Sequence, residues 1–388
     1  MSWKEHFSRS VGRDGAPLHF AAHSHHPWPD ITFEAQQQYW LDSAERLDRK
    51  WERVFAETIP AVQRAIAKQL ALPDPPTIAF APNTHSLLNR LLSATRVLTK
   101  HNVLSTDAEF HSFTRQMDRL AEEDLVNLVR VPVEPFATFK DRFIAQLKRR
   151  DDWDIVWLSH VFFNSGWVLS HNDLIEILAA IPSDETFAVI DGYHAFMAIP
   201  LDLCAIGGRA FYIAGGYKYA MAGEGACFMH CPPGYGPRPR DTGWYAEFGA
   251  LEAAREGVAY GTDGSRFAGA TFDPSGLYRM DAVMAWLDDI GLDVKTMDDH
   301  CIGLQRRFLK DLDAASNAFS TKDLIVRDVI ECGRFLTFRT PDAARIDHEL
   351  SERDIIVDHR RDRLRIGFGI YQTEADVDRL LKALRTIA

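Results

Sequence analysis

Residues 187–218 read FAVIDGYHAFMAIPLDLCAIGGRAFYIAGGYK and contain two short apolar runs that end in polar residues. The first run ends at Asp191, and the second leads through two glycines to Lys218. The spacing accommodates one connection and one further strand. We therefore expect Asp191 and Lys218 to stand at neighbouring strand ends.

The surrounding chain alternates apolar runs with amphipathic helical patterns. Near-continuous apolar runs indicate strands buried on both faces of a mostly parallel sheet. Seven such runs occupy residues 77–81, 102–106, 127–133, 154–160, 187–194, 210–218 and 226–232. Ligands of these sheets bind beyond the carboxyl ends of the strands. The polar residues that end the runs are therefore candidate site residues.

The flanking regions predict two further parts. A long helical pattern from about residue 31 places Trp40, Leu47 and Trp51 on one face, and Pro60 is expected to break or kink it. The C-terminal part contains two strand candidates, 334–340 and 362–370, with helical patterns between and after them. We predict an N-terminal arm and start of the small lobe, a large domain and a small C-terminal domain, at residues 1–45, 46–260 and 261–388.

Composition excludes several classes of protein. The 388 residues exceed the roughly 250–300 that one core supports, which favours two lobes. A net charge of −11 argues against general nucleic-acid binding. No apolar run has the length of a membrane span, and MSWKEHFSRS has no apolar signal core, so we expect a cytoplasmic protein without a membrane partner. The five sparse cysteines do not indicate a disulfide framework.

Three positions could carry chemistry, and each has a structural alternative. Glycines around Lys218 permit close approach of a ligand, and partial burial suits an amine to Schiff-base chemistry, although a lysine can also extend from a strand end to solvent. Asp191 could bond a protonated pyridine nitrogen or cap a turn. Asn83 and Thr84 open a helical stretch, where they could hold a phosphate or act as an ordinary N-cap.

Metal binding is not predicted. The loop histidines His19, His23, His25 and His26 lack a nearby carboxylate, and the Cys227–Cys231 pair has no second half.

Six segments, in order, resemble motifs of the fold-type I pyridoxal 5′-phosphate (PLP) enzymes of the class V aminotransferase group, and are most similar to the kynureninase family. They are LHFAAHSHHPWPD (18–30), SHVFFNSGWVLS (159–170), DGYHAFMAIPLDL (191–203), GGYKYAMAGEGA (215–226), DTGWYAEF (241–248) and IIVDHRRDRLRIGFGIYQT (355–373). The resemblance implies an α/β fold, with a mostly parallel seven-stranded sheet in a large domain and a smaller α+β C-terminal domain.

The resemblance also implies roles for single residues. Lys218 resembles the Schiff-base lysine, Asp191 the partner of the pyridine nitrogen and His194 a neighbour of the ring. The other implied cofactor contacts are Asn83, Thr84, Tyr217 and Trp244 at the phosphate, and Phe110 on the ring, with His111 as its competitor. Arg365 resembles the arginine that binds the substrate α-carboxylate.

Two departures from the family pattern concern the substrate. His23 and Ser24 stand in a loop where the family has Asn-Ser, near the substrate. Thr271 stands where the family places an asparagine; in the wider class, a Gly-Thr pair here reaches the phosphate of the neighbouring subunit. Thr271 is therefore a candidate for either role.

The function implied by the resemblance is hydrolytic cleavage of a β,γ carbon–carbon bond of an amino acid, giving alanine and an aromatic acid. The alternative is a class V aminotransferase or related PLP lyase acting on another amino acid. Cysteine desulfuration ranks lower, because the stretch 355–365 contains no cysteine. The resemblance also implies a homodimer with shared active sites.

Overall fold

Seven strands form the central sheet of the computed structural model, which describes residues 3–96, 99–234, 236–250 and 257–387. They are β2 (Ile78–Ala81), β3 (His101–Thr106), β4 (Val126–Val131), β5 (Ile155–Ser159), β6 (Phe187–Asp191), β7 (Ala210–Gly215) and β8 (Cys227–His230). The spatial order is β2-β8-β7-β6-β5-β3-β4, and only β8 runs against its neighbours. This confirms the predicted mostly parallel seven-stranded sheet.

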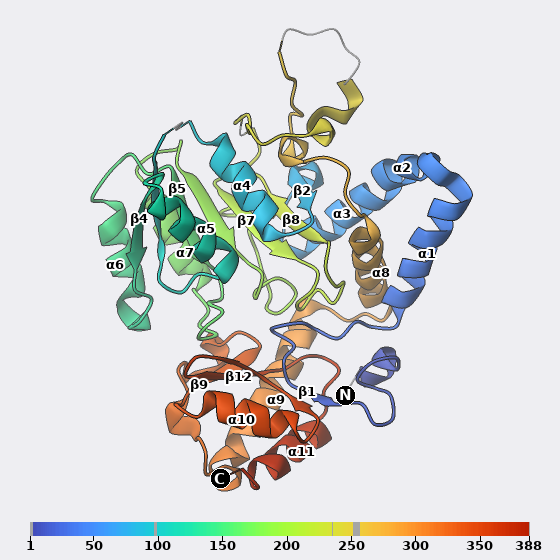
Figure 1. Ribbon diagram of the computed structural model, residues 1–388, viewed down its shortest axis with the longest axis vertical. Coiled ribbons are helices and arrows are strands. Elements are labelled where there is room, and N and C mark those ends of the chain that lie inside the picture. The colour runs from blue at the N-terminus through green and yellow to red at the C-terminus, as the bar shows by residue number, and fades with distance from the viewer. Residues whose placement is uncertain (1–2, 97–98, 235, 251–256, 388) are drawn as a thin grey trace.

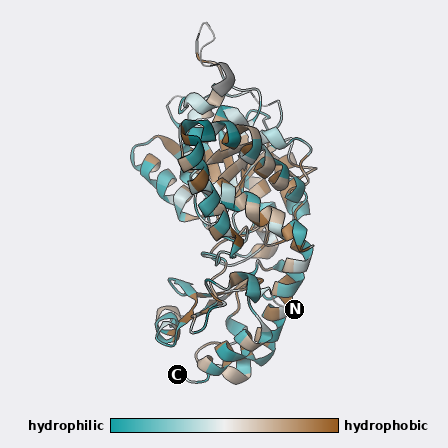
Figure 2. Ribbon diagram, turned by 90° about the vertical axis from the view of Figure 1, so that its right-hand side faces the viewer, coloured by the Kyte–Doolittle hydropathy of each residue, from teal (hydrophilic) through white to brown (hydrophobic). Residues whose placement is uncertain are grey.

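Both faces of the sheet are buried, as the sequence predicts. In β6, Phe187 and Val189 join one apolar cluster, whereas Ala188 and Ile190 join another. Helices α4 (Thr84–Ala94) and α5 (His111–Glu122) cover the first face. The second face is covered by α3 (Ile59–Gln69), α6 (Phe139–Leu147) and α7 (His171–Ala179). Figure 1 shows this layered arrangement, and Figure 2 shows apolar residues gathered in the strands between polar outer helix faces.

The N-terminal helical region bends before Pro60. Helix α1 (Ile31–Arg46) ends at Leu47, whose φ of 54° is left-handed. The chain continues through α2 (Lys50–Arg53) and a π-helical turn, η3 (Val54–Thr58). Pro60 lies in the first turn of α3, directly after this π-helical turn, so the helix changes beside the proline, at a position where its missing N–H is tolerated. Of the residues predicted to share one face, Trp40 is 67% exposed and Leu47 is 68% exposed.

A smaller C-terminal lobe lies below the sheet in Figure 1. Its antiparallel sheet consists of β11 (Asp358–Arg360), β12 (Arg363–Gly367) and β9 (Phe335–Arg339). Its helices are α9 (Val294–Ala315), α10 (Ala343–Ser351) and α11 (Glu374–Leu384). The N-terminal arm joins this lobe, because β1 (Leu18–His19) pairs with β10 (Ile355–Ile356). Helix α8 (Ser275–Asp289) leads into the lobe and packs on α1 and α3. The predicted boundaries at residues 45 and 260 stay predictions.

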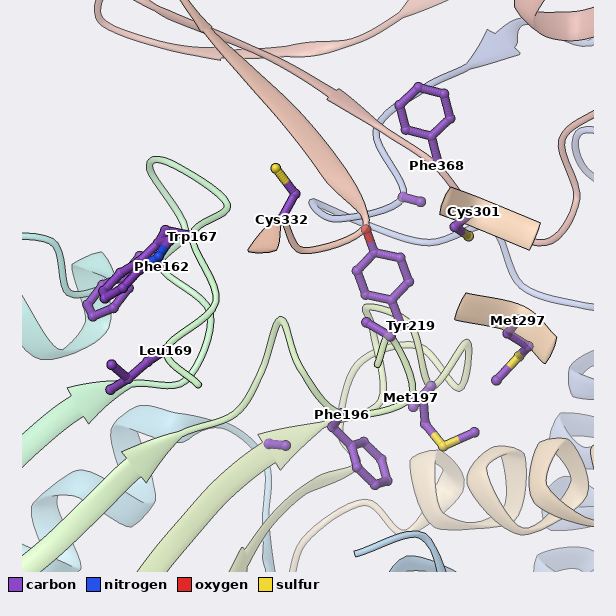
Figure 3. Close-up of a cluster of buried hydrophobic side chains, with 14 of the residues drawn as sticks. Phe162, Trp167, Leu169, Phe196, Met197, Tyr219, Met297, Cys301, Cys332 and Phe368 are labelled. Atoms are coloured by element: carbon purple, nitrogen blue, oxygen red, sulfur yellow. The ribbon is translucent and has the colours of Figure 1, made fainter. Parts of the chain in front are cut away.

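The two lobes meet directly beside the loop that follows β7. Tyr219 reaches into the lobe junction, and its hydroxyl donates a hydrogen bond to the Arg334 carbonyl at 2.9 Å. Figure 3 shows its ring among apolar side chains from both lobes, including Met197, Met297 and Cys301. This contact fixes the backbone next to Lys218 against the C-terminal lobe. In the described part of the chain, no helix is long and apolar enough to cross a membrane.

Candidate active site

The structure places Asp191 and Lys218 at one edge of the sheet, as the sequence predicts. Strands β6 and β7 are parallel neighbours, Asp191 is the last residue of β6, and Lys218 follows β7. The Lys218 amine is buried and donates a hydrogen bond to the His23 carbonyl at 2.9 Å. Burial, reinforced by the charge of Arg365, lowers the pKa of Lys218 to about 7, against the opposing effect of Asp191.

Asp191 is buried, and one of its carboxyl oxygens accepts a hydrogen bond from the backbone. Its Oδ1 accepts a hydrogen bond from the Tyr193 N–H at 3.0 Å. Burial raises the pKa of Asp191 to about 6, although this N–H and Lys218 favour the charged form. A carboxylate therefore predominates at neutral pH. Such a group can hold a protonated ring nitrogen.

Arg365 enters the site from β12 of the C-terminal lobe. The guanidinium is buried, donates to the Phe163 carbonyl at 2.6 Å and forms an ion pair with Asp358. Burial lowers the pKa of Arg365 to about 10, so it stays cationic at neutral pH. Its Nε atom is buried without a hydrogen-bond partner among the described residues. One donor therefore remains for a ligand.

His23, in the N-terminal loop, is fully buried. Its ring stacks on Phe335 with centroids 4.5 Å apart, and its Nε2 lies 3.7 Å from an Asp358 oxygen. Both ring nitrogens are buried without a hydrogen-bond partner in the described structure. Burial, followed by the charge of Arg365, holds the pKa of His23 well below its usual value. The neighbouring Ser24 is half-buried, and its N–H donates to the Ala21 carbonyl.

Two further predicted residues lie around Lys218. The ring of His194 lies 5.5 Å from that of Phe335, and burial holds the pKa of His194 well below its usual value. The Phe110 ring centroid lies 5.7 Å from the Lys218 Nζ. His111, the alternative to Phe110, is an exposed residue whose ring contacts Phe163. The structure therefore places Phe110 at the amine.

Asn83 and Thr84 begin helix α4, as predicted. Asn83 Oδ1 accepts a hydrogen bond from the Ser86 N–H at 3.0 Å, so this oxygen serves as the helix cap and its amide group remains as a donor. Thr84 is buried, and its hydroxyl lies 3.9 Å from the Cys227 thiol. The positive end of the helix dipole and its free N–H groups favour an anion here.

Tyr217 borders the same region. Its ring stacks on His25 at 5.2 Å and lies 5.1 Å from the ring of Tyr193. Tyr193 is buried, and its hydroxyl interacts with Thr84 and Cys227. Sequence reasoning did not select Tyr193, although it lies within the segment DGYH. Only its position two residues after Asp191 could have singled it out.

Trp244 and Thr271 are placed together. Trp244 is 44% exposed, begins η6 (Trp244–Ala250) and lies 4.6 Å from the Tyr245 ring. Thr271 is exposed and lies beside the Tyr245 hydroxyl. The segment that Trp244 begins is at the top of Figure 1, away from the C-terminal lobe that supplies Arg365.

Asp358 and Glu109 are two further site residues that sequence reasoning missed. Asp358 is the register partner of Arg365 in the β11–β12 hairpin and forms an ion pair with it. Its signal was the hairpin pattern around the DHRRDRLR segment. Glu109 is buried next to Phe110, and no local pattern distinguishes it from a surface acid of the loop that precedes α5.

These residues fit the cofactor expected from the sequence. Lys218 supplies a buried amine, Asp191 a carboxylate at the same sheet edge and Thr84 a helix N-terminus for a phosphate. Tyr193 packs closely on β7, because a Cβ on Gly215 would come within 2.1 Å of its hydroxyl. The unpartnered nitrogens of His23 and Arg365 need polar contacts that a bound ligand could provide. The described residues hold no group of three or more His, Cys, Asp or Glu placed to bind a metal.

Comparisons with known proteins agree with this geometry. The family model described as Aminotransferase class-V matches residues 21–380. Isopenicillin N epimerase from Streptomyces clavuligerus is 27% identical over 333 residues, which cover 80% of each chain. Kynureninase from Deinococcus radiodurans is 26% identical over 242 residues, covering 61% of this chain and 57% of that protein. A cysteine desulfurase from Thermococcus onnurineus superposes with a TM-score of 0.80 and 16% identity, covering 99% and 98% of the two chains, and shows the fold alone.

Proposed function

The chain belongs to the aminotransferase class-V family, whose cofactor is PLP, and from this premise we propose that it removes the α-proton of an amino acid with Lys218 as the base. The observation that carries the proposal is the buried Lys218 amine, whose pKa is lowered to about 7 between Asp191 and Arg365. An amine with this pKa exchanges protons readily at neutral pH.

Each residue of the site has a separate proposed role. PLP, when bound, supplies an electron sink for the charge that develops at the substrate α-carbon. Lys218 takes a proton from that carbon and can return one to it. Asp191 holds a proton on the cofactor's ring nitrogen, while Thr84, Asn83 and Tyr217 hold the phosphate. His194 and Phe110 confine the ring.

Substrate binding is assigned to the C-terminal lobe and the N-terminal loop. Arg365 binds the α-carboxylate, for which it has a free Nε donor. His23 and Ser24 contact the substrate side chain. The buried imidazole of His23 has one donor and one acceptor without partners, so it favours a side chain that carries a polar group.

We propose that the chain catalyses the reaction of a class V aminotransferase or of a related PLP lyase. Kynureninase-like β,γ cleavage is the second candidate, supported by the 26% identity to a kynureninase and by the six motifs. His23 and Thr271, which differ from the family pattern near the substrate, favour a substrate other than kynurenine. Desulfuration is disfavoured, because Cys332 is buried and its thiol lies against the Val326 carbonyl at 3.5 Å.

We also propose a homodimer in which Trp244 and Thr271 reach the partner's phosphate site. Their placement beside Tyr245, apart from the chain's own Lys218 cluster, supports this arrangement. Apolar side chains, including Phe55, Phe80 and Phe272, line a cavity of about 520 Å³ on this side of Tyr245. A second copy would cover this surface.

A proton-exchange assay tests the proposed function. Holoenzyme in D₂O is incubated with a panel of L-amino acids that includes L-kynurenine and 3-hydroxykynurenine, and NMR follows loss of the α-proton and formation of products. We expect exchange that Lys218→Ala abolishes and that Lys140→Ala, a surface control paired with Asp173 and Glu176, leaves unchanged. Exchange that persists in Lys218→Ala contradicts the proposal. Release of alanine from L-kynurenine selects the second candidate.

A further inference from the structure

A second buried carboxyl lies next to Asp191. Glu109, in the loop between β3 and α5, is 3% exposed. Its Oε1 accepts hydrogen bonds from the Thr106 hydroxyl at 2.6 Å and the Ser159 N–H at 3.2 Å, and its Oε2 accepts one from the Ser159 hydroxyl at 2.6 Å. All these partners are uncharged. Burial without a cationic partner favours the protonated form of this carboxyl, and it outweighs the three hydrogen bonds, which favour the ionised form.

The register of the sheet places Glu109 close to Asp191. Ser159, which binds both Glu109 oxygens, is the register partner of Asp191 on adjacent parallel strands, which lie about 4.8 Å apart. Burial, together with the charge of Asp191, raises the pKa of Glu109 to about 8. The pKa of Asp191 is raised to about 6, so as the pH rises Asp191 ionises first and Glu109 second.

The other titratable groups near this pair belong to the site. Lys218 faces Asp191 and favours its ionised form. The charge of Asp191 also acts on Tyr212, Tyr217 and Cys227, and burial keeps all three neutral at neutral pH. Apart from Lys218, whose pKa is lowered to about 7, Glu109 is therefore the group of this cluster expected to change charge just above neutral pH.

We propose that Glu109 is a positioning residue for Asp191: a negative charge on Glu109 keeps the cofactor's ring nitrogen protonated through Asp191. The neutral form leaves Asp191 as the single anion beside the ring. The ionised form adds negative charge, which increases the proton affinity of Asp191 and of the nitrogen that it holds. The inference rests on the proposed role of Asp191.

Glu109→Gln tests this inference, because glutamine keeps the size and the acceptor oxygen of the side chain but cannot ionise. The infrared spectrum of the holoenzyme at pH 7 should contain a protonated-carboxyl stretch that Glu109→Gln lacks. The exposed acid Glu122, on α5, provides the matched control Glu122→Gln, which should retain the band. Ser159→Ala removes one hydrogen bond to the carboxylate, so the band should persist to higher pH. A band unchanged by Glu109→Gln overturns the proposal.

The effect on the cofactor is measured by NMR of holoenzyme loaded with PLP that carries ¹⁵N in the ring. In Glu109→Gln the ring nitrogen should lose its proton at a pH lower by roughly one unit. An unchanged titration in Glu109→Gln, combined with a changed signal in Asp191→Asn, overturns the role of Glu109 alone. An unchanged ¹⁵N signal in Asp191→Asn overturns the proposed role of Asp191 and, with it, the inference.

Discussion

Burial changes the proton affinity of Lys218 and Asp191 in opposite directions. The Lys218 amine loses its proton near neutral pH, whereas Asp191 keeps a proton to about pH 6. At neutral pH the site therefore holds a partly neutral amine and a charged carboxylate at the carboxyl ends of two neighbouring parallel strands. These are the protonation states that proton transfer from a substrate carbon and retention of a protonated ring nitrogen require.

The stability of the cofactor-free protein should depend on this amine. Unfolding returns the pKa of Lys218 from about 7 to its usual value near 10.4, so between these values the unfolded state binds more protons. Stability contributed by this group therefore rises with pH, by at most about 1.4 kcal/mol per pH unit. Urea unfolding of apoprotein and of Lys218→Met should give a free-energy difference that shifts in favour of the wild type from pH 7 to 10. A difference independent of pH contradicts the lowered pKa.

Arg365 should control substrate affinity without controlling cofactor content. Its guanidinium contacts Phe163 and Asp358, and none of its hydrogen bonds involves the α4 terminus assigned to the phosphate. Arg365→Gln should raise KM for amino acids by roughly 10–100-fold, because a charged hydrogen bond to the carboxylate is lost. Bound PLP, measured by absorbance, should stay stoichiometric. Arg379→Gln, an exposed arginine on α11, is the control; loss of PLP from Arg365→Gln would show that its role is not carboxylate binding.

Contacts between elements decide where the N-terminal loop lies. His23 packs on β12 so closely that a Cβ on Gly367 would come within 2.2 Å of the His23 Nδ1. The loop is also tied to the large domain, because the Lys218 amine binds the His23 carbonyl. Strand β12 therefore positions both Arg365 and the loop that faces the substrate.

Gly367→Ala should displace this loop. Overpacking of a close contact costs roughly 1–3 kcal/mol, which thermal unfolding measures, and the amino-acid KM should rise in parallel. The double variant His23→Ala/Gly367→Ala removes the clashing ring and should recover part of the lost stability, although the Ala22 N–H still lies 3.1 Å from the added Cβ. Additive effects of the two substitutions would indicate that the ring and the strand do not interact.

The sequence predicts the elements better than it predicts their contacts. Apolar runs identify all seven strands, and the segment DGYH with GGYK places Asp191 and Lys218 correctly at adjacent strand ends. Glu109 and Tyr193 escape detection, because their roles depend on burial by segments distant in sequence. The bend at Leu47 is not predicted for a different reason, because no local sequence pattern indicates a left-handed conformation in leucine. Pro60 is a strong local signal, but it lies in the first turn of α3, where a helix accepts proline.

The whole molecule has its proposed phosphate contacts in two separate places. Thr84 lies at the sheet edge near Lys218, whereas Trp244 and Thr271 lie beside Tyr245 in a segment directed away from the C-terminal lobe. Among the described residues of one chain, no contact joins these two groups into one site. A symmetric dimer would bring the second group of each copy to the first group of its partner, as a two-fold interface requires.

Active-site complementation tests this arrangement. Lys218→Ala lacks the amine, and the double variant Trp244→Ala/Thr271→Val lacks the proposed phosphate contacts, so each alone should have little α-proton exchange activity. In a mixed dimer, one of the two sites combines the intact Lys218 of one copy with the intact Trp244 and Thr271 of the other. Random pairing makes about half of the dimers mixed, so about a quarter of all sites should be intact. Co-expression with two affinity tags isolates the mixed dimer, and sedimentation gives its mass. If each site uses residues from one chain only, the mixed dimer contains no intact site, and its activity will not exceed that of the two parent variants.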